Sequence, residues 1–300
     1  MEHFPLVSIV TPAYNQAEYL AETIESVLAQ DYPNIEYIVL DDGSTDSTPE
    51  VLKRYNDRVY WERQENMGQA RTLNKGWSMA RGSLLGYLSS DDRLKPNAIS
   101  EMVRALTKQP EFVVAYCDFD LIDAKGRIFR TVKAENFNAK RLNVDLVCQP
   151  GPGALFLRKV FEQTGGWAGQ LRQIPDFEFW LRSSKFGPFV RVPQVLAEYR
   201  VHEGSASFAP TTAERSMEIV DVMTAYWDVQ TGYHPRRALA KAYLLSAKSH
   251  AQSSRIHACV LQFKKALSYN PSLIWSLETW LILISGFLRR TIYCLKMRNK

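Results

Sequence analysis

Two short apolar segments of this sequence each run into a pair of aspartates, and this pattern limits the possible folds more than any other feature. The segment EYIVL leads into Asp41-Asp42, and the segment LLGYL leads through two serines into Asp91-Asp92. Apolar runs of this length are consistent with buried strands. Because ligands of open α/β sheets bind beyond the carboxyl ends of the strands, we expect both acid pairs at the ligand-binding edge of one sheet.

The order of the predicted elements indicates an α/β fold. A strand over residues 6–11, a helix over 17–30 and a strand over 36–40 form a βαβ unit, whose two strands should be parallel neighbours. Further strands are expected at 59–62, 84–88, 112–117, 154–157 and 195–201, with a hairpin that turns at Lys125-Gly126. Further helices are expected at 68–81, 96–108 and 176–186, and in one that has Thr48 as its N-cap and Pro49 in its first turn.

The chain changes character beyond the last of these strands. From about Thr211 the pattern is helical, so the sequence predicts an α/β domain over residues 1–208 and a helical tail over 209–300. Within the tail, residues 238–271 are similar to a single tetratricopeptide unit. Since one unit cannot form a solenoid, two helices packed against each other are the simpler interpretation.

Charge and cysteine content bear on partners and location. The formal net charge of +5 comes from 37 basic and 32 acidic residues, but five of the basic residues lie in the last twelve positions, which contain no acid. The rest of the chain is therefore neutral, which argues against a nucleic-acid partner. The four cysteines show no CxxC spacing, which is typical of a reducing compartment. The N-terminus has no signal-peptide pattern, and we expect a cytoplasmic protein.

Four motifs together resemble the inverting family 2 glycosyltransferases, which have the GT-A fold. They are the TPAYN turn after the first strand, the two acid pairs, and the segment DFEFW that follows GGW and QIP. The resemblance extends from residue 6 to about residue 205. It implies transfer of a sugar from a nucleotide-diphosphate donor, with a UDP-sugar expected, to a hydroxyl of a saccharide or lipid-linked acceptor. It also implies a role in assembling a cell-surface polysaccharide or glycolipid.

The resemblance assigns roles to individual residues. It implies that Asp92 and His202 are ligands of Mg²⁺ or Mn²⁺ and that Asp176 is the general base. Ser90 stands where other members carry an aspartate, which leaves the metal role with Asp92. Contacts to the nucleotide are implied for Pro12, Tyr14, Asp42, Arg71 and Asp91.

Carboxylates suit these roles for chemical reasons. A hard divalent cation takes oxygen ligands, and Mg²⁺ usually binds only one or two protein carboxylates. Such a cation stabilises the charge that develops on a leaving diphosphate. A carboxylate within hydrogen-bond reach can accept the proton of the attacking hydroxyl. One base and an in-line attack give inversion without a covalent intermediate.

Each motif also has a simpler structural explanation. Asp, Gly and Ser favour turns, so both acid pairs could be turn formers only. Asp176 could cap its helix, and His202 could be a structural histidine. The alternative for the whole protein is a degenerate module that binds sugar nucleotides without catalysis. Dinucleotide-binding and P-loop enzymes are disfavoured, because the first turn lacks GxGxxG and no GxxxxGK[ST] motif occurs.

The most apolar long segment of the chain lies in the tail, at residues 272–290. Its apolar part is shorter than the roughly 20 residues that a membrane-spanning helix needs. It carries Trp275 and Trp280, a residue type that favours the membrane–water interface, and a basic segment follows it. The sequence therefore predicts an interfacial helix that makes peripheral contact with a membrane. The alternative is a helix that packs on the core of the tail.

Overall fold

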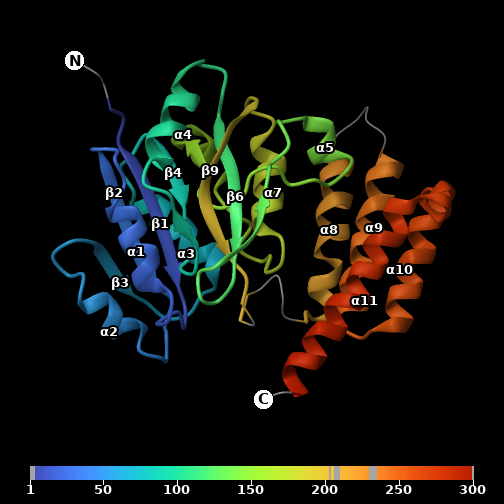
Figure 1. The fold of residues 1–300 in the computed structure, drawn as a ribbon. Helices are drawn as coiled ribbons and strands as arrows, with labels where there is room; N and C mark the ends of the chain where they lie inside the picture. The colour runs from blue at the N-terminus through green and yellow to red at the C-terminus, as the bar shows by residue number, and fades with distance from the viewer. Residues whose placement is uncertain (1–3, 203, 206–209, 230–234, 299–300) are drawn as a thin grey trace. The chain divides into compact units, whose positions relative to one another are not determined.

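The computed structural model describes residues 4–202, 204–205, 210–229 and 235–298 (Figure 1). The chain divides into two compact units. The first unit holds the residues up to Phe137 together with Cys148–Val201. The second unit holds Asn138–Val147 together with the chain from His202 onward.

The described part of the first unit contains one nine-stranded sheet, in the order β3-β2-β1-β4-β8-β6-β9-β5, with β7 paired to β6 off this path. Parallel pairing joins β1 to β2 and β4, β2 to β3, and β6 to β9, whereas the other pairs are antiparallel. The strands are β1 (Val7–Ala13), β2 (Ile35–Asp41), β3 (Tyr60–Arg63), β4 (Leu84–Tyr87), β5 (Arg93–Leu94), β6 (Val114–Ile122), β7 (Ile128–Val132), β8 (Leu155–Leu157) and β9 (Phe189–Arg200).

Helices cover both faces of this sheet, which confirms the predicted α/β class. The helices of the first unit are α1 (Leu20–Leu28), α2 (Thr48–Lys53), α3 (Gln69–Met79), α4 (Ala98–Thr107), α6 (Arg158–Thr164) and α7 (Pro175–Ser183). On one face, Ile24 of α1 and Met102 of α4 are fully buried in one cluster with Ile9 of β1. On the other face, α3 approaches β1 so closely that a Cβ added to Gly76 would lie 2.4 Å from a methyl group of Val10.

An aromatic cluster fills the second face and fixes α7 to the sheet. Trp77 of α3 is fully buried, and its indole N–H donates to the carbonyl of Gly86 in β4 at 3.0 Å. The Trp77 ring centroid lies 5.2 Å from that of Phe156, 5.9 Å from that of Phe179 and 6.1 Å from that of Trp167. Because Phe179 belongs to α7, this packing holds the start of α7 near the end of β4.

Two local predictions differ from the structure. β9 begins at Phe189, six positions before the predicted strand, because its first half pairs with β6 from Val114 onward. Thr48 is the first residue of α2 and not its N-cap, a position that Ser47 occupies. The Thr48 hydroxyl instead accepts a hydrogen bond from the amide of Gln16 at 2.9 Å.

The described part of the second unit is helical, with α5 (Ala139–Asn143), α8 (Ala213–Val229), α9 (Pro235–Gln252), α10 (Ile256–Tyr269), the 3₁₀ turn η1 (Pro271–Trp275) and α11 (Leu277–Arg298). The predicted helix pair corresponds to α9 and α10. Leu244, Cys259 and Leu283 lie in a buried cluster that these two helices share with α11. Within the described ranges, no helix is both long and apolar enough to cross a membrane.

η1 and α11 also carry apolar side chains that are exposed to solvent. The side chain of Trp275 is 89% exposed and that of Leu277 is 73% exposed, whereas Thr279 and Leu283 on the opposite side of α11 are buried. We call the exposed set the apolar stripe of the tail, and it comprises Ile274, Trp275, Leu277, Trp280, Leu281, Ile284, Phe287 and Leu288.

Candidate active site

The Asp42 carboxylate ties the end of β2 to the start of α3. Asp42 is 2% exposed. Its Oδ1 accepts hydrogen bonds from the Met67 amide and the Gln64 side chain, both at 2.9 Å, and its Oδ2 accepts one from the Gly68 amide at 2.8 Å. Its own amide donates to the carbonyl of Ala13 at the end of β1 at 2.8 Å. The second acid of the first pair therefore joins three segments at one edge of the sheet.

Asp41, the first acid of the pair, holds the turn that follows β2. It is fully buried, and its Oδ1 accepts a hydrogen bond from the Ser44 amide at 2.9 Å. Its Oδ2 has no hydrogen-bond partner among the described residues and lies 3.4 Å from the Arg63 Nε. The turn-forming explanation of this motif therefore applies to Asp41.

The TPAYN turn lies against the loop after β2. Asn15 has a φ of 53°, a conformation that Asn adopts more readily than most residues. Its amide donates to the Ser44 hydroxyl at 2.9 Å, and its side-chain oxygen accepts from the Thr45 amide at 2.7 Å. Pro12 is buried in β1, whereas the Tyr14 side chain is 48% exposed. Tyr14 is therefore accessible beside the predicted nucleotide-binding loop.

Two arginines lie near the start of α3. Arg71 is exposed, and its Cγ would be 3.0 Å from a Cβ added to Gly169. A guanidinium nitrogen of Arg172 would be 1.5 Å from a Cβ added to Gly68, whose φ is +87°. Guanidinium groups suit recognition of phosphate oxygens. The sequence analysis identified Arg71 but missed Arg172, whose only signal was its place four residues before Asp176.

Asp92 is a buried carboxylate that follows β4. It is 2% exposed, its Oδ1 accepts a hydrogen bond from the Arg200 amide at 2.8 Å, and its carbonyl accepts one from the Thr23 hydroxyl at 2.8 Å. Burial and the adjacent charge of Asp91 raise the pKa of Asp92, against the opposing effect of Arg200. The side chain therefore lies where a nearby cation would favour its charged form.

Asp91 and Asp92 provide some, but not all, of the ligands that a divalent cation needs. Among the described residues, no group of three or more His, Cys, Asp or Glu side chains converges as a complete metal site. Mg²⁺ is commonly held by one or two carboxylates together with substrate phosphates, and Asp92 with Asp91 beside it provides such a donor set. The hydrogen bond from the Arg200 amide goes to Oδ1 of Asp92, the other carboxylate oxygen being Oδ2.

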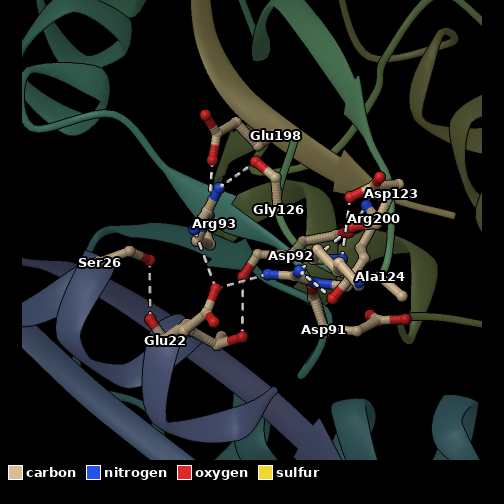
Figure 2. A network of polar contacts seen from close by, with 12 residues as sticks. Glu22, Ser26, Asp91, Asp92, Arg93, Asp123, Ala124, Gly126, Glu198 and Arg200 are labelled. Carbon is tan, nitrogen blue, oxygen red and sulfur yellow. Dashed lines mark hydrogen bonds and ion pairs between the residues drawn. The ribbon is translucent and has the colours of Figure 1, made fainter. Parts of the chain in front are cut away.

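Arg200 is a buried residue that sequence reasoning missed. It is 1% exposed and ends β9. Its guanidinium donates to the carbonyl of Asp91 at 2.8 Å, to the carbonyl of Ala124 at 3.2 Å and to the carboxylate of Glu22 at 2.7 Å (Figure 2). It also lies 4.7 Å from the ring centroid of Tyr19. One side chain thus joins β9, α1, the turn after β6 and the loop that carries both acids.

Asp176 is in the first turn of α7, as the motif predicts. The backbone amides of Asp176 and Phe177 lower the pKa of its carboxyl group, since a helix N-terminus favours a negative charge. Burial has the larger effect and raises the pKa of Asp176. An aspartate of raised pKa is a stronger base than an ordinary one.

Tyr87, the last residue of β4, is a buried residue whose pKa is influenced by both Asp176 and Asp92. It is 9% exposed, and its ring centroid lies 5.0 Å from that of Trp167. Burial raises the pKa of Tyr87 well above its usual value, and the charges of Asp176, Cys148 and Asp92 raise it further. The charges of the two acids that the sequence analysis assigned to base and metal ligand thus both contribute to the raised pKa of Tyr87.

His202 begins the second unit of the chain. Its amide donates to the Ser205 hydroxyl at 3.0 Å, and its carbonyl accepts from the Ser205 amide at 3.0 Å. The role of His202 as a metal ligand stays a prediction, since it belongs to a different unit from Asp92.

Several known proteins resemble this chain in sequence. The sequence profile of "Glycosyl transferase family 2" matches residues 8–165. An uncharacterized glycosyltransferase of Rickettsia prowazekii is 30% identical over 82% of this chain and 77% of its own length. The chondroitin synthase of Escherichia coli is 27% identical over 69% of this chain, which covers only 30% of that protein.

Solved structures show the same fold. Residues 1–349 of S. aureus TarS, determined in complex with UDP-GlcNAc, match with a TM-score of 0.66 over 98% of this chain and 92% of that one, at 16% identity. A mannosyltransferase of Pyrobaculum calidifontis, in complex with GDP-Man and Mn²⁺, matches with a TM-score of 0.62. The match covers 98% of this chain and 88% of that one, at 17% identity. With more than half of its length matched by the family profile, the chain belongs to glycosyltransferase family 2.

Proposed function

We propose that this glycosyltransferase moves a sugar from a nucleotide-diphosphate sugar to a hydroxyl of a saccharide or lipid-linked acceptor, with inversion at the anomeric carbon and with help from Mg²⁺ or Mn²⁺. The observation that carries the proposal is the packing around β1 and β4. Asp42 and Asp92 follow β2 and β4, which both pair in parallel with β1. Phe179 of α7, the helix that carries Asp176, stacks on Trp77, whose indole is hydrogen-bonded to Gly86 of β4.

Asp176 is the proposed base. Its raised pKa still leaves it able to accept a proton from the acceptor hydroxyl as that oxygen attacks. At the helix N-terminus, the backbone amides of Asp176 and Phe177 favour the charged carboxylate. Asp92, with Asp91 and the predicted ligand His202, would hold the divalent cation, which when bound stabilises charge on the departing diphosphate.

The donor end of the site is proposed to be the edge formed by the ends of β1 and β2. Asp42 would contact the base, with Pro12 and Tyr14 flanking it, and Arg71 would line the diphosphate. The complexes of TarS with UDP-GlcNAc and of the Pyrobaculum enzyme with GDP-Man support a nucleotide-sugar donor. A UDP-sugar is the donor we expect. The similarity to chondroitin and hyaluronan synthases supports a role in polysaccharide assembly.

Peripheral membrane contact through the tail is part of the proposal. The apolar stripe of the tail would lie in the headgroup region, where Trp275 and Trp280 are favoured. Five basic residues and no acid follow the stripe between positions 289 and 300, and they would attract anionic lipids. The enzyme would then work on a lipid-linked acceptor at the cytoplasmic face of a membrane.

A thermal-shift screen against UDP-, GDP- and dTDP-sugars, each with Mg²⁺ or Mn²⁺, tests the proposed donor. We expect a UDP-sugar with Mn²⁺ to raise the melting temperature most. Release of UDP should be measured beside it, because a binding module without catalysis would give the shift but no turnover. A protein stabilised by none of the nucleotide sugars would contradict the proposal.

A further inference from the structure

The carboxylate of Asp42 is partly occupied by the protein itself. Its Oδ1 accepts two hydrogen bonds, from the Met67 amide and from Nε2 of Gln64, each at 2.9 Å. Its Oδ2 accepts one, from the Gly68 amide at 2.8 Å. An ionised carboxylate offers about four acceptor sites, shared equally between its oxygens. Among the described residues no further donor reaches Asp42, so the remaining acceptor site lies on Oδ2.

Gln64 faces Asp42 with its amide nitrogen because two neighbours fix the amide group. Nζ of Lys75 donates to Oε1 of Gln64 at 3.0 Å, and Nε2 also donates to the Thr72 hydroxyl at 3.0 Å. That hydroxyl donates in turn to the carbonyl of Gly68 at 3.1 Å. If the amide turned over, Oε1 would face the carboxylate and Nε2 would face the ammonium group of Lys75. The hydrogen bonds therefore run in one direction, from Lys75 to Asp42.

The number of available acceptor sites decides which nucleotide bases a carboxylate can recognise. Uracil has a single N–H on its pairing edge, and this one donor matches the one site on Oδ2 of Asp42. Guanine presents two adjacent donors, N1–H and the N2 amino group, which together need one acceptor site on each carboxylate oxygen. A polar group that loses water without gaining a partner weakens binding strongly. The occupied Oδ1 of Asp42 therefore disfavours guanine.

We propose that Gln64 determines the base specificity of the donor. By occupying Oδ1 of Asp42, it limits the carboxylate to one acceptor site, which fits the single N–H of a uracil-type base and rejects the paired donors of guanine. Lys75 is the positioning residue that holds the Gln64 amide in this orientation. The inference rests on the proposed function, in which Asp42 contacts the base of a nucleotide-diphosphate sugar. Neither Gln64 nor Lys75 would touch the substrate.

The test compares the affinities of the full chain for UDP and GDP by isothermal titration calorimetry. Both nucleotides carry the same ribose and diphosphate, so a change in the ratio of their dissociation constants reports on the base. The wild type should bind UDP more tightly than GDP. Gln64→Met preserves the length of the side chain but removes the donor, which opens the second site of Oδ1 to the guanine amino group. The preference for UDP should then fall by about 10-fold, which corresponds to about 1.4 kcal/mol.

A purely structural role of Gln64 predicts a different result. Gln64→Met should bind UDP nearly as the wild type does, because the amides of Met67 and Gly68 still hold Asp42. A general loss of structure would instead weaken the binding of UDP and GDP together and leave their ratio unchanged. Lys75→Met should reduce the preference by a smaller factor, since it only allows the Gln64 amide to turn over.

Glu62→Gln is the matched control. The Glu62 carboxylate forms an ion pair with Lys75 at 2.6 Å, but among the described residues it has no hydrogen bond to Gln64 or Asp42. Its replacement removes a charge from the same group of side chains and leaves the hydrogen bond from Lys75 to Gln64 in place. The preference of this variant for UDP should equal that of the wild type.

The outcomes separate this inference from the proposed function. A preference for UDP that is the same in the wild type and in Gln64→Met would overturn the inference and leave nucleotide-sugar transfer intact. A wild type that binds GDP at least as tightly as UDP would do the same. A wild type that binds neither nucleotide, with or without Mn²⁺, would overturn both. If Gln64→Met does not fold, Lys75→Met decides alone, because the Lys75 side chain is 32% exposed and its replacement is tolerated more easily.

Discussion

Asp42 and Gly68 are joined by a hydrogen bond of 2.8 Å from the Gly68 amide to Oδ2 of Asp42. The bond connects the end of one strand to the start of a helix that lies 26 positions later. A residue proposed to bind the nucleotide base thus also holds the local backbone in place. The two roles have separable consequences.

Replacing Asp42 with alanine should lower both stability and donor affinity. The amides of Met67 and Gly68 would lose their acceptor, and an unsatisfied buried donor costs about 1–3 kcal/mol. Urea unfolding measures the loss of stability, and calorimetry measures UDP affinity. Asp42→Asn keeps one acceptor oxygen and should lie between the wild type and the alanine variant. If Asp42→Ala leaves donor affinity unchanged, the residue is structural only.

Asp92→Asn should abolish nearly all transferase activity in a folded protein. The amide oxygen can still accept from the Arg200 backbone, so only the charge is removed. Loss of a group that stabilises the leaving diphosphate is expected to lower kcat by roughly 10²- to 10³-fold, as for other electrostatic contacts in a transition state. Circular dichroism checks the fold. Full activity of the wild type in EDTA would refute the metal role.

Asp176→Asn should abolish turnover while donor binding persists, because the base acts on the acceptor. The wild-type product should have the anomeric configuration opposite to that of the donor, which proton NMR of the product determines. Retention of configuration would rule out a single-base displacement.

The raised pKa of Asp176 predicts two effects of pH and charge. The base must be deprotonated, so kcat should fall as pH drops, at a higher pH than for an ordinary aspartate. Since the folded protein has the higher pKa, the charged form costs stability in full above that pKa. The cost shrinks as pH falls below it and is gone below the ordinary pKa of an unfolded aspartate. Asp176→Asn should therefore melt at the same temperature as the wild type or a higher one at neutral pH. A clear loss of stability would mean that the helix N-terminus outweighs burial.

The apolar stripe of the tail predicts binding to anionic vesicles. The full chain should float with such vesicles at low salt, and Trp275→Glu with Leu277→Glu should not, since both side chains are strongly exposed. Ile128→Glu is the control, because Ile128 is 55% exposed on β7. High salt should weaken flotation, as expected for a basic flank. A wild type that stays in the soluble fraction would remove the membrane proposal.

Much of the donor edge was predictable, because its signals are local. Apolar runs that end in acids specify buried strands and their carboxyl ends, and the structure places Asp42 and Asp92 there. Asp176 was recognisable because its motif surrounds it in sequence.

Arg200 was not predictable in the same way. Its side chain reaches Glu22, which lies 178 positions earlier, and nothing in the intervening sequence indicates the contact. The N-cap assignment of Thr48 failed for a similar reason, because its hydroxyl is engaged by Gln16 across the loop. Secondary-structure propensity reflects only the residues nearby in sequence. Arg200 and Thr48 are instead positioned by residues that are distant in sequence and close in space.

The distance in sequence between Glu22 and Arg200 also affects how the protein is made. Chains emerge from the ribosome N-terminal end first, and domains fold as their parts become available. The strands β1, β2 and β4 are complete by residue 87, but the arginine whose amide donates to Asp92 arrives more than a hundred residues later. During synthesis the part of the sheet that carries Asp42 can therefore assemble first, and the loop with Asp92 gains its contacts to Arg200 only when β9 is added.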